Sequence, residues 1–179
     1  MRSQKSREVA WTGMLFALAI ALSFLESAIT PLLGLMPAMK LGLSNLVVMY
    51  ALLFLNTRTA AELVLLKALF ALLTRGPTAG FLSLCGGVLS FLVLWGLLHL
   101  PASPEEFIFT VSGALAHNIG QLLGASGLLS SAMALGYAPV LLVAGLCVGA
   151  LSCVLSKALF AAMPKNAPGR VNQYKLFKK

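Results

Sequence analysis

Long apolar runs dominate the chain, and short segments with proline, glycine or charged residues separate them. A bilayer core of about 30 Å requires roughly 20 helical residues for each crossing. On this basis the pattern predicts six membrane-spanning helices. We place them near residues 9–27, 41–55, 60–74, 79–100, 107–126 and 137–163. The second and third runs are short, at about 22 Å each, so they must extend into their flanks or be buried among the other helices.

Local sequence signals mark several of these boundaries. Residues 59–62 (TAAE) predict a capping box in which Thr59 caps the third helix and Glu62 reaches back to it. Residues 103–106 (SPEE) predict a second box before the fifth helix. The glycine and proline at 76–77 are expected to separate the third helix from the fourth. The two boxes give their acidic residues a structural role, so we do not place these residues in the site.

Composition supports a membrane protein, since 59% of the residues are hydrophobic and only 10% are charged. A soluble domain needs more polar surface than this. The predicted fold class is therefore an all-α integral membrane protein built as a six-helix bundle. Residues 1–8 form a basic cytoplasmic N-terminus, 9–163 the transmembrane domain and 164–179 a basic cytoplasmic tail. The first run has no clean cleavage site before Glu26, so we interpret it as a retained helix.

The basic residues predict the orientation of the protein. The net charge is +8, and most basic residues gather at the two ends of the chain, namely Arg2, Lys5, Arg7, Lys165, Arg170, Lys175, Lys178 and Lys179. The positive-inside rule then places both termini in the cytoplasm, which requires an even number of crossings. We expect a multi-pass protein of a prokaryotic plasma membrane. Because these charges account for orientation, they do not imply a nucleic-acid partner.

Other polar residues collect at one depth in this topology. Lys40, Lys67 and Arg75 are basic residues that the orientation rule does not explain. Lys40 and Arg75 flank outer loops, while Glu26 and Asn45 fall in the outer halves of the first two spans. Charged and amide groups at that depth are costly unless they pair or line a wet cavity. The pattern therefore predicts one outward-opening pocket.

The fifth predicted helix adds polar groups to this pocket. One of its faces carries Gly113, His117, Gly120, Gln121 and Gly124. The glycines allow close helix approach, and His117 and Gln121 then line the pocket or hydrogen-bond to neighbouring helices. Asn118 lies about one residue step off this face, so its role is less defined. The predicted substrate-binding residues are Glu26, Lys40, Asn45, Arg75, His117, Asn118 and Gln121.

A second stripe lies on the first predicted helix, where Gly13, Ala17 and Ala21 follow one another at four-residue intervals. Glu26 comes nine residues after Ala17, which places it on the opposite side of a helix. If Glu26 faces the pocket, this small-residue ridge faces outward and suits docking of another membrane helix. Packing within the bundle is the alternative. For a similar ridge over residues 145–153 we favour packing within the bundle.

Several stretches together match a known family pattern. They are residues 16–27 (FALAIALSFLES), 40–45 (KLGLSN), 76–81 (GPTAGF) with Gly86 and Gly87, and 113–121 (GALAHNIGQ). Over about residues 10–160 the set resembles the Gx transporter family, also labelled heptaprenyl diphosphate synthase component I. That family is similar to the S components of energy-coupling-factor (ECF) vitamin importers.

The resemblance implies an S-component fold with six helices and a ligand site in the outer half of the membrane. Loops after the first, third and fifth spans would cover this site. The resemblance further implies that Ala17 and Ala21 dock to a transmembrane coupling subunit, and that two soluble ATPases drive transport.

The chain lacks the groups that common catalytic mechanisms need. Prenyl diphosphate synthases hold Mg²⁺ through clustered aspartates, whereas this sequence contains no aspartate and adjacent acids only at 105–106. It also has no Walker loop, zinc-protease motif or nucleophile elbow. Three cysteines lie inside apolar runs, where they act as packing residues. We therefore expect no catalysis by this chain alone, no cofactor and no metal site.

Two functions remain from different classes. The first is a substrate-binding subunit of an importer for a small anionic or amphipathic solute, such as a vitamin or cofactor precursor. Lys40, Arg75 and His117, with Lys67 as a further candidate, would give its pocket positive character. Its partners would be the solute, the bilayer, the coupling subunit and the ATPases. The alternative is a non-catalytic membrane partner of a polyprenyl diphosphate synthase in quinone synthesis, whose basic tail at 165–179 contacts the soluble enzyme.

Overall fold

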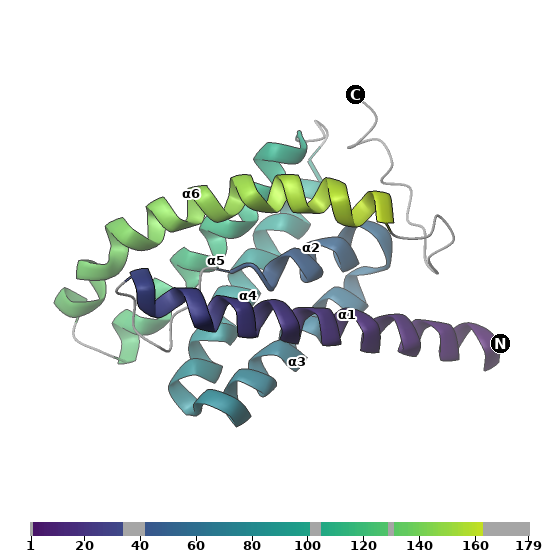
Figure 1. Cartoon of the computed structure of the whole chain (residues 1–179), viewed down its shortest axis with the longest axis horizontal. Coiled ribbons are helices and arrows are strands. Elements are labelled where there is room, and N and C mark those ends of the chain that lie inside the picture. The colour runs from purple at the N-terminus through teal and green to yellow at the C-terminus, as the bar shows by residue number, and fades with distance from the viewer. Residues whose placement is uncertain (1, 34–41, 101–104, 129–130, 163–179) are drawn as a thin grey trace.

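The computed structural model describes residues 2–33, 42–100, 105–128 and 131–162, and within these ranges the regular structure is helical (Figure 1). The elements are α1 (Arg2–Ile29), the 3₁₀ turn η1 (Thr30–Leu33), α2 (Asn45–Phe54), α3 (Thr57–Arg75), α4 (Pro77–Leu98), α5 (Glu106–Leu128) and α6 (Ser131–Ala162). Each α-helix overlaps one predicted run. Two differ clearly, because α1 already begins at Arg2 and α2 is shorter than its run.

The start of α3 corrects the predicted capping box at 59–62. The N-cap is Asn56, whose side-chain oxygen accepts a hydrogen bond from the backbone N–H of Thr59 at 2.6 Å. Glu62 does not reach back to a cap, since its carboxylate pairs with Arg58 at 3.2 Å one turn earlier. Asparagine is among the strongest N-cap residues, which explains why the helix begins before Thr59. The second predicted box, at 103–106, lies partly outside the described residues.

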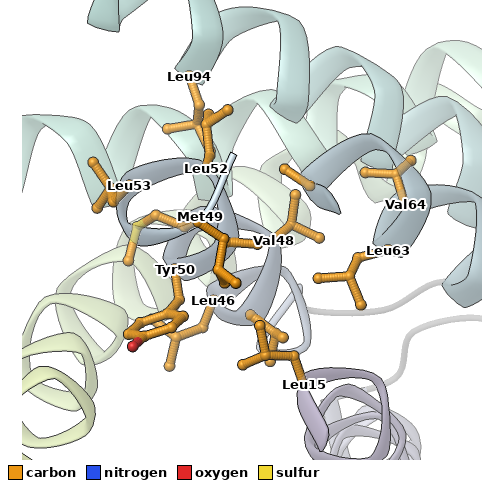
Figure 2. Packing of buried hydrophobic residues seen from close by; sticks show 14 of the residues in the cluster. Leu15, Leu46, Val48, Met49, Tyr50, Leu52, Leu53, Leu63, Val64 and Leu94 are labelled. Atoms are coloured by element: carbon orange, nitrogen blue, oxygen red, sulfur yellow. The ribbon is translucent and has the colours of Figure 1, made fainter. Parts of the chain in front are cut away.

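Helix α2 is enclosed by the rest of the bundle, as Figure 2 shows. All its residues from Asn45 to Leu53 are buried. Leu15 of α1, Leu63 of α3 and Leu94 of α4 belong to the same hydrophobic cluster. Ten helical residues extend only about 15 Å, half of a bilayer core. Of the two arrangements expected for this short run, the structure has the buried one.

Glycines set the closest helix approaches. A Cβ atom added to Gly120 on α5 would lie 2.6 Å from the carbonyl oxygen of Cys85 on α4, so α4 and α5 pack with almost no space between them. On α6, Gly145 packs against Leu115 and Gly149 against Val111, both on α5. The ridge at 145–153 therefore packs within the bundle, as predicted. Small residues at crossings are typical of membrane helices.

The distribution of polarity is that of a membrane protein. Large apolar side chains such as Leu73 on α3 and Val143 on α6 are exposed, at 76% and 62%. Polar side chains such as Glu26, His117 and Gln121 are buried. In the part of the chain that the structure describes, three segments are long and apolar enough to cross a membrane, Glu8–Ile29, Pro77–Leu98 and Ala138–Leu155. In Figure 1 the first turn of α1 and the last turn of α6 lie towards the same end of the bundle.

Candidate functional site

A short segment at the start of α2, residues 42–45, contacts three other helices. The backbone N–H of Leu43 donates a hydrogen bond to the carboxylate of Glu26 on α1. Gly42 packs against the ring of His117 on α5. The side-chain amide of Asn45 donates to the hydroxyl of Ser90 on α4. This 42–45 segment therefore joins predicted site residues that are far apart in the sequence.

His117 is held between two glycines. Gly42 has φ +100°, a left-handed conformation that favours glycine, and a Cβ atom there would lie 3.0 Å from His117 Cδ2. On the other side, a Cβ atom at Gly86 would lie 2.9 Å from His117 Nδ1. The histidine is only 3% exposed. The absence of two Cβ atoms thus makes the space that an imidazole occupies inside the bundle.

Opposite charges meet where α1, α3 and the 42–45 segment come together. Glu26 is fully buried near the end of α1. Arg75, the last residue of α3, donates to the carbonyl oxygen of Ser23 at 3.3 Å and interacts electrostatically with Glu26. A buried carboxylate is costly without such interactions. Arg75 and Glu26 are thus close enough to influence each other electrostatically, and their role in one pocket stays a prediction.

Asn45 leads into a hydrogen-bonded chain and a small cavity. Ser90 accepts from Asn45 and donates to the carbonyl oxygen of Gly113 on α5 at 2.8 Å. The cavity has room for about one water molecule and includes Asn45, Thr110 and Ser152 in its lining. Asn45 Oδ1 is buried and accepts no hydrogen bond from the described residues. A buried amide oxygen without a donor costs free energy, so this cavity suits a water or a donor group of a solute.

The other two polar residues of α5 have different surroundings. Asn118 donates from Nδ2 to the carbonyl oxygen of Leu141 on α6 at 2.8 Å. It therefore connects α5 to α6, in keeping with its predicted offset from the polar face. Gln121 is buried one turn beyond His117. Among His117, Asn118 and Gln121, it is His117 that packs against Gly42 of the 42–45 segment.

The remaining predicted residues lie away from the 42–45 segment or outside the residues that the structure describes. Lys40 lies outside the described residues. Gly13, Ala17 and Ala21 are exposed on α1, and a Cβ atom at Gly13 would have no neighbour within 4 Å. The small-residue ridge thus faces away from the buried Glu26, as the nine-residue spacing predicts. Its docking role stays a prediction.

Sequence reasoning missed several polar groups of the site. Ser90 lies four residues after Gly86 and so shares its helical face. Treating these two positions as one small polar stripe would have identified Ser90 as a candidate. Thr110 and Ser152, which line the cavity, carried no such signal. Single hydroxyls in apolar helices usually hydrogen-bond to the backbone one turn earlier.

The family comparison covers this whole arrangement. A model of the family described as heptaprenyl diphosphate synthase component I matches residues 15–159. This range is more than half of the chain and includes the 42–45 segment with all its contacts. No curated protein and no solved structure matches the chain.

Proposed function

The chain belongs to the heptaprenyl diphosphate synthase component I family, and we propose that it is the membrane-embedded, non-catalytic substrate-binding subunit of an importer. The observation that carries this proposal is the polar cluster around the 42–45 segment, which is buried in a bundle with an apolar surface. Polar and ionisable groups inside a membrane protein are expensive and therefore mark solute pathways. An S-component-like bundle of six spanning helices gives these groups a function.

The charges of the cluster favour an anionic or amphipathic solute. Glu26 is its one carboxylate among the described residues, and Arg75 interacts with it. In this proposal Lys40, which precedes Gly42 by two residues in the sequence, adds a second positive charge. The buried His117 and the amide of Asn45 supply hydrogen-bonding groups. A small acid with polar groups, such as a vitamin or cofactor precursor, complements this set.

Binding requires the 42–45 segment to move. The cavity beside Asn45 leaves room for about one water molecule in this arrangement. A solute gains access when Leu43 leaves the carboxylate of Glu26 and Gly42 leaves the ring of His117. The structure thus corresponds to a closed form in this proposal. The small-residue ridge would dock a transmembrane coupling subunit, and ATPases would drive opening from the cytoplasm.

The proposal is tested by the solute that the protein retains. The full chain is purified from native membranes in mild detergent, and bound small molecules are extracted and identified by mass spectrometry. We expect a solute that is enriched with the wild type and depleted in Arg75→Ala and in His117→Ala. Both variants should still insert into the membrane. Arg58→Ala is the matched control, since Arg58 is an exposed base paired with Glu62. Retention of the solute by both site variants at the wild-type level would contradict the proposed pocket.

A second candidate follows from the family description, a membrane partner of a soluble prenyl diphosphate synthase. The absence of aspartate in the sequence makes this chain an anchor rather than the catalyst. Among the described residues, no group of three or more His, Cys, Asp or Glu side chains lies together to hold a metal ion. In this alternative the basic tail at 165–179 contacts the enzyme. It leaves the buried cluster around the 42–45 segment without a function.

A further inference from the structure

The cavity beside Asn45 takes its polar lining from three helices. Asn45 of α2, Thr110 of α5 and Ser152 of α6 line it, and each of them is at most 6% exposed. None of the described residues in the lining is charged. The kind of chemical group that fits here therefore depends on where the hydrogens of these three side chains already point.

Ser90 fixes the orientation of the Asn45 amide. The hydroxyl of Ser90 lies 2.8 Å from the carbonyl oxygen of Gly113, which can only accept, so the hydroxyl hydrogen points there. The Ser90 oxygen is left to accept, and it accepts from Nδ2 of Asn45. Ser90 does not line the cavity, and Oδ1 of Asn45 is buried without a hydrogen bond from the described residues. Asn45 therefore offers the cavity an acceptor.

Thr110 offers the cavity a second acceptor. Its hydroxyl donates to the carbonyl oxygen of Phe107 at 3.0 Å, about one turn earlier on α5. A hydroxyl has one hydrogen and two lone pairs, so the oxygen of Thr110 can only accept from a group in the cavity. The hydroxyl of Ser152 can rotate to donate or to accept. Two fixed acceptors and one adaptable hydroxyl thus surround a space for about one water molecule.

Size and hydrogen count together restrict the group that can enter. Two fixed acceptors require two hydrogens, and the space admits one heavy atom. A hydroxyl has a single hydrogen and would leave one buried acceptor without a donor, which costs free energy. A carboxylate or phosphate has no hydrogen to offer and is too large. An –NH₂ group has two hydrogens on one atom of about the size of a water molecule, so it complements the cavity in both respects.

We infer that the solute carries an –NH₂ group, as an amine, a carboxamide or a ring amino group, and that this group binds between Asn45 and Thr110. The inference rests on the proposed function and specifies the solute of that site. Gly42 is part of the cavity wall, so movement of the 42–45 segment makes room for the rest of the molecule. With the anion expected near Arg75, the solute combines an acidic group with an –NH₂ group. Ser90 is a positioning residue, because it orients Asn45.

The test begins with the full chain purified from native membranes in mild detergent. Bound small molecules are released and identified by high-resolution mass spectrometry, and exchange in deuterium oxide counts their hydrogens on nitrogen and oxygen. We expect the solute that is depleted in Arg75→Ala to contain an –NH₂ group. An Arg75-dependent solute without this group would overturn the inference and leave the proposed function standing. Absence of any retained solute from the wild type would overturn both.

The acceptor at Thr110 is tested by an isosteric change. Thr110→Val should lower the solute retained per protein after gel filtration by about tenfold or more, because an N–H loses its acceptor. Thr110→Ser keeps the hydroxyl and should restore retention. Thr12→Val is the matched control, since the hydroxyl of Thr12 also donates to the backbone, at Glu8 on α1, and lies outside the cavity. Wild-type retention by Thr110→Val would overturn the inference.

The positioning role of Ser90 has its own readout, which also decides the matter if Thr110→Val fails to fold. The identified solute is compared with its analogue in which hydrogen replaces the –NH₂ group, by competition against the isotope-labelled solute. The wild type should bind the analogue at least about tenfold more weakly, because it leaves buried acceptors unpaired. In Ser90→Ala the amide of Asn45 is free to turn, so this preference should fall severalfold. Equal binding of both compounds by the wild type would overturn the –NH₂ assignment, and an undiminished preference in Ser90→Ala would overturn the positioning role.

Discussion

At the scale of single residues, the site depends on side chains that are absent as much as on those present. Gly42 and Gly86 leave room for the ring of His117. The left-handed conformation of Gly42 also directs the N–H of Leu43 to Glu26 and places Asn45 beside Ser90. One backbone conformation thus supports three contacts of the candidate site.

Gly42→Ala should therefore lower the free energy of unfolding by about 1–3 kcal/mol, through left-handed strain and displacement of His117. Thermal unfolding in mild detergent measures the change. Gly96→Ala is the control, because Gly96 lies in α4 and an added Cβ there would have no neighbour within 4 Å. An unchanged midpoint for Gly42→Ala would show that this conformation does not support the site.

The proximity of site residues was predictable only in part. Depth in the membrane follows from position along a helix, so Glu26 and Arg75 could be expected to meet. Rotation about each helix depends on packing, which is why Lys67 lines a separate small cavity between α1, α3 and α4. The predicted cap at Thr59 was wrong because Asn56 competes for the same helix end. The binding roles themselves stay predictions.

At the scale of elements, α1 and α2 are buried to different extents and have different roles in the bundle. Helix α1 buries Glu26 on one side and exposes the small-residue ridge on the other. Helix α2 contributes its whole length to the core. Apolar runs located the helices well, since burial and lipid contact both require apolar side chains. The sequence pattern did not fix the length of α2, because the apolar run continues across the turn at 42–44, and Gly42 there was not recognised as a helix boundary.

The ridge on α1 allows a direct test of partner docking. Replacing Ala17 and Ala21 together with leucine should reduce recovery of the membrane partner by about tenfold or more, because close helix approach requires small residues. Thermal stability should not fall, since both positions are exposed. Ala150→Leu on exposed α6 surface is the matched control and should retain the partner. Undiminished recovery with the double variant would remove the ridge from the interface.

At the scale of the whole molecule, polarity is inverted relative to a soluble protein. Apolar side chains cover the described surface, and the buried positions include a carboxylate, an imidazole and several amides. Composition alone was sufficient to predict this class. Composition did not predict which of the shorter or more polar helices span the bilayer. Helix α2 is too short for a crossing, and α3 carries Arg58, Glu62 and Lys67.

The topology makes a prediction for the two chain ends. Green fluorescent protein fused to either terminus should be fluorescent, and periplasmic phosphatase fused to either terminus should be inactive, because basic residues retain both ends in the cytoplasm. Whole-cell fluorescence and phosphatase activity are measured for the four fusions. Opposite locations for the two termini would require an odd number of crossings and would contradict the six-span bundle.

The measurement that tests the central claim most directly is co-purification from native membranes in mild detergent, with the recovered proteins identified by mass spectrometry. We expect a coupling membrane subunit together with its ATPases, in amounts comparable to the tagged chain. Recovery of a soluble prenyl diphosphate synthase without an ATPase module would contradict the importer function and support the anchoring alternative.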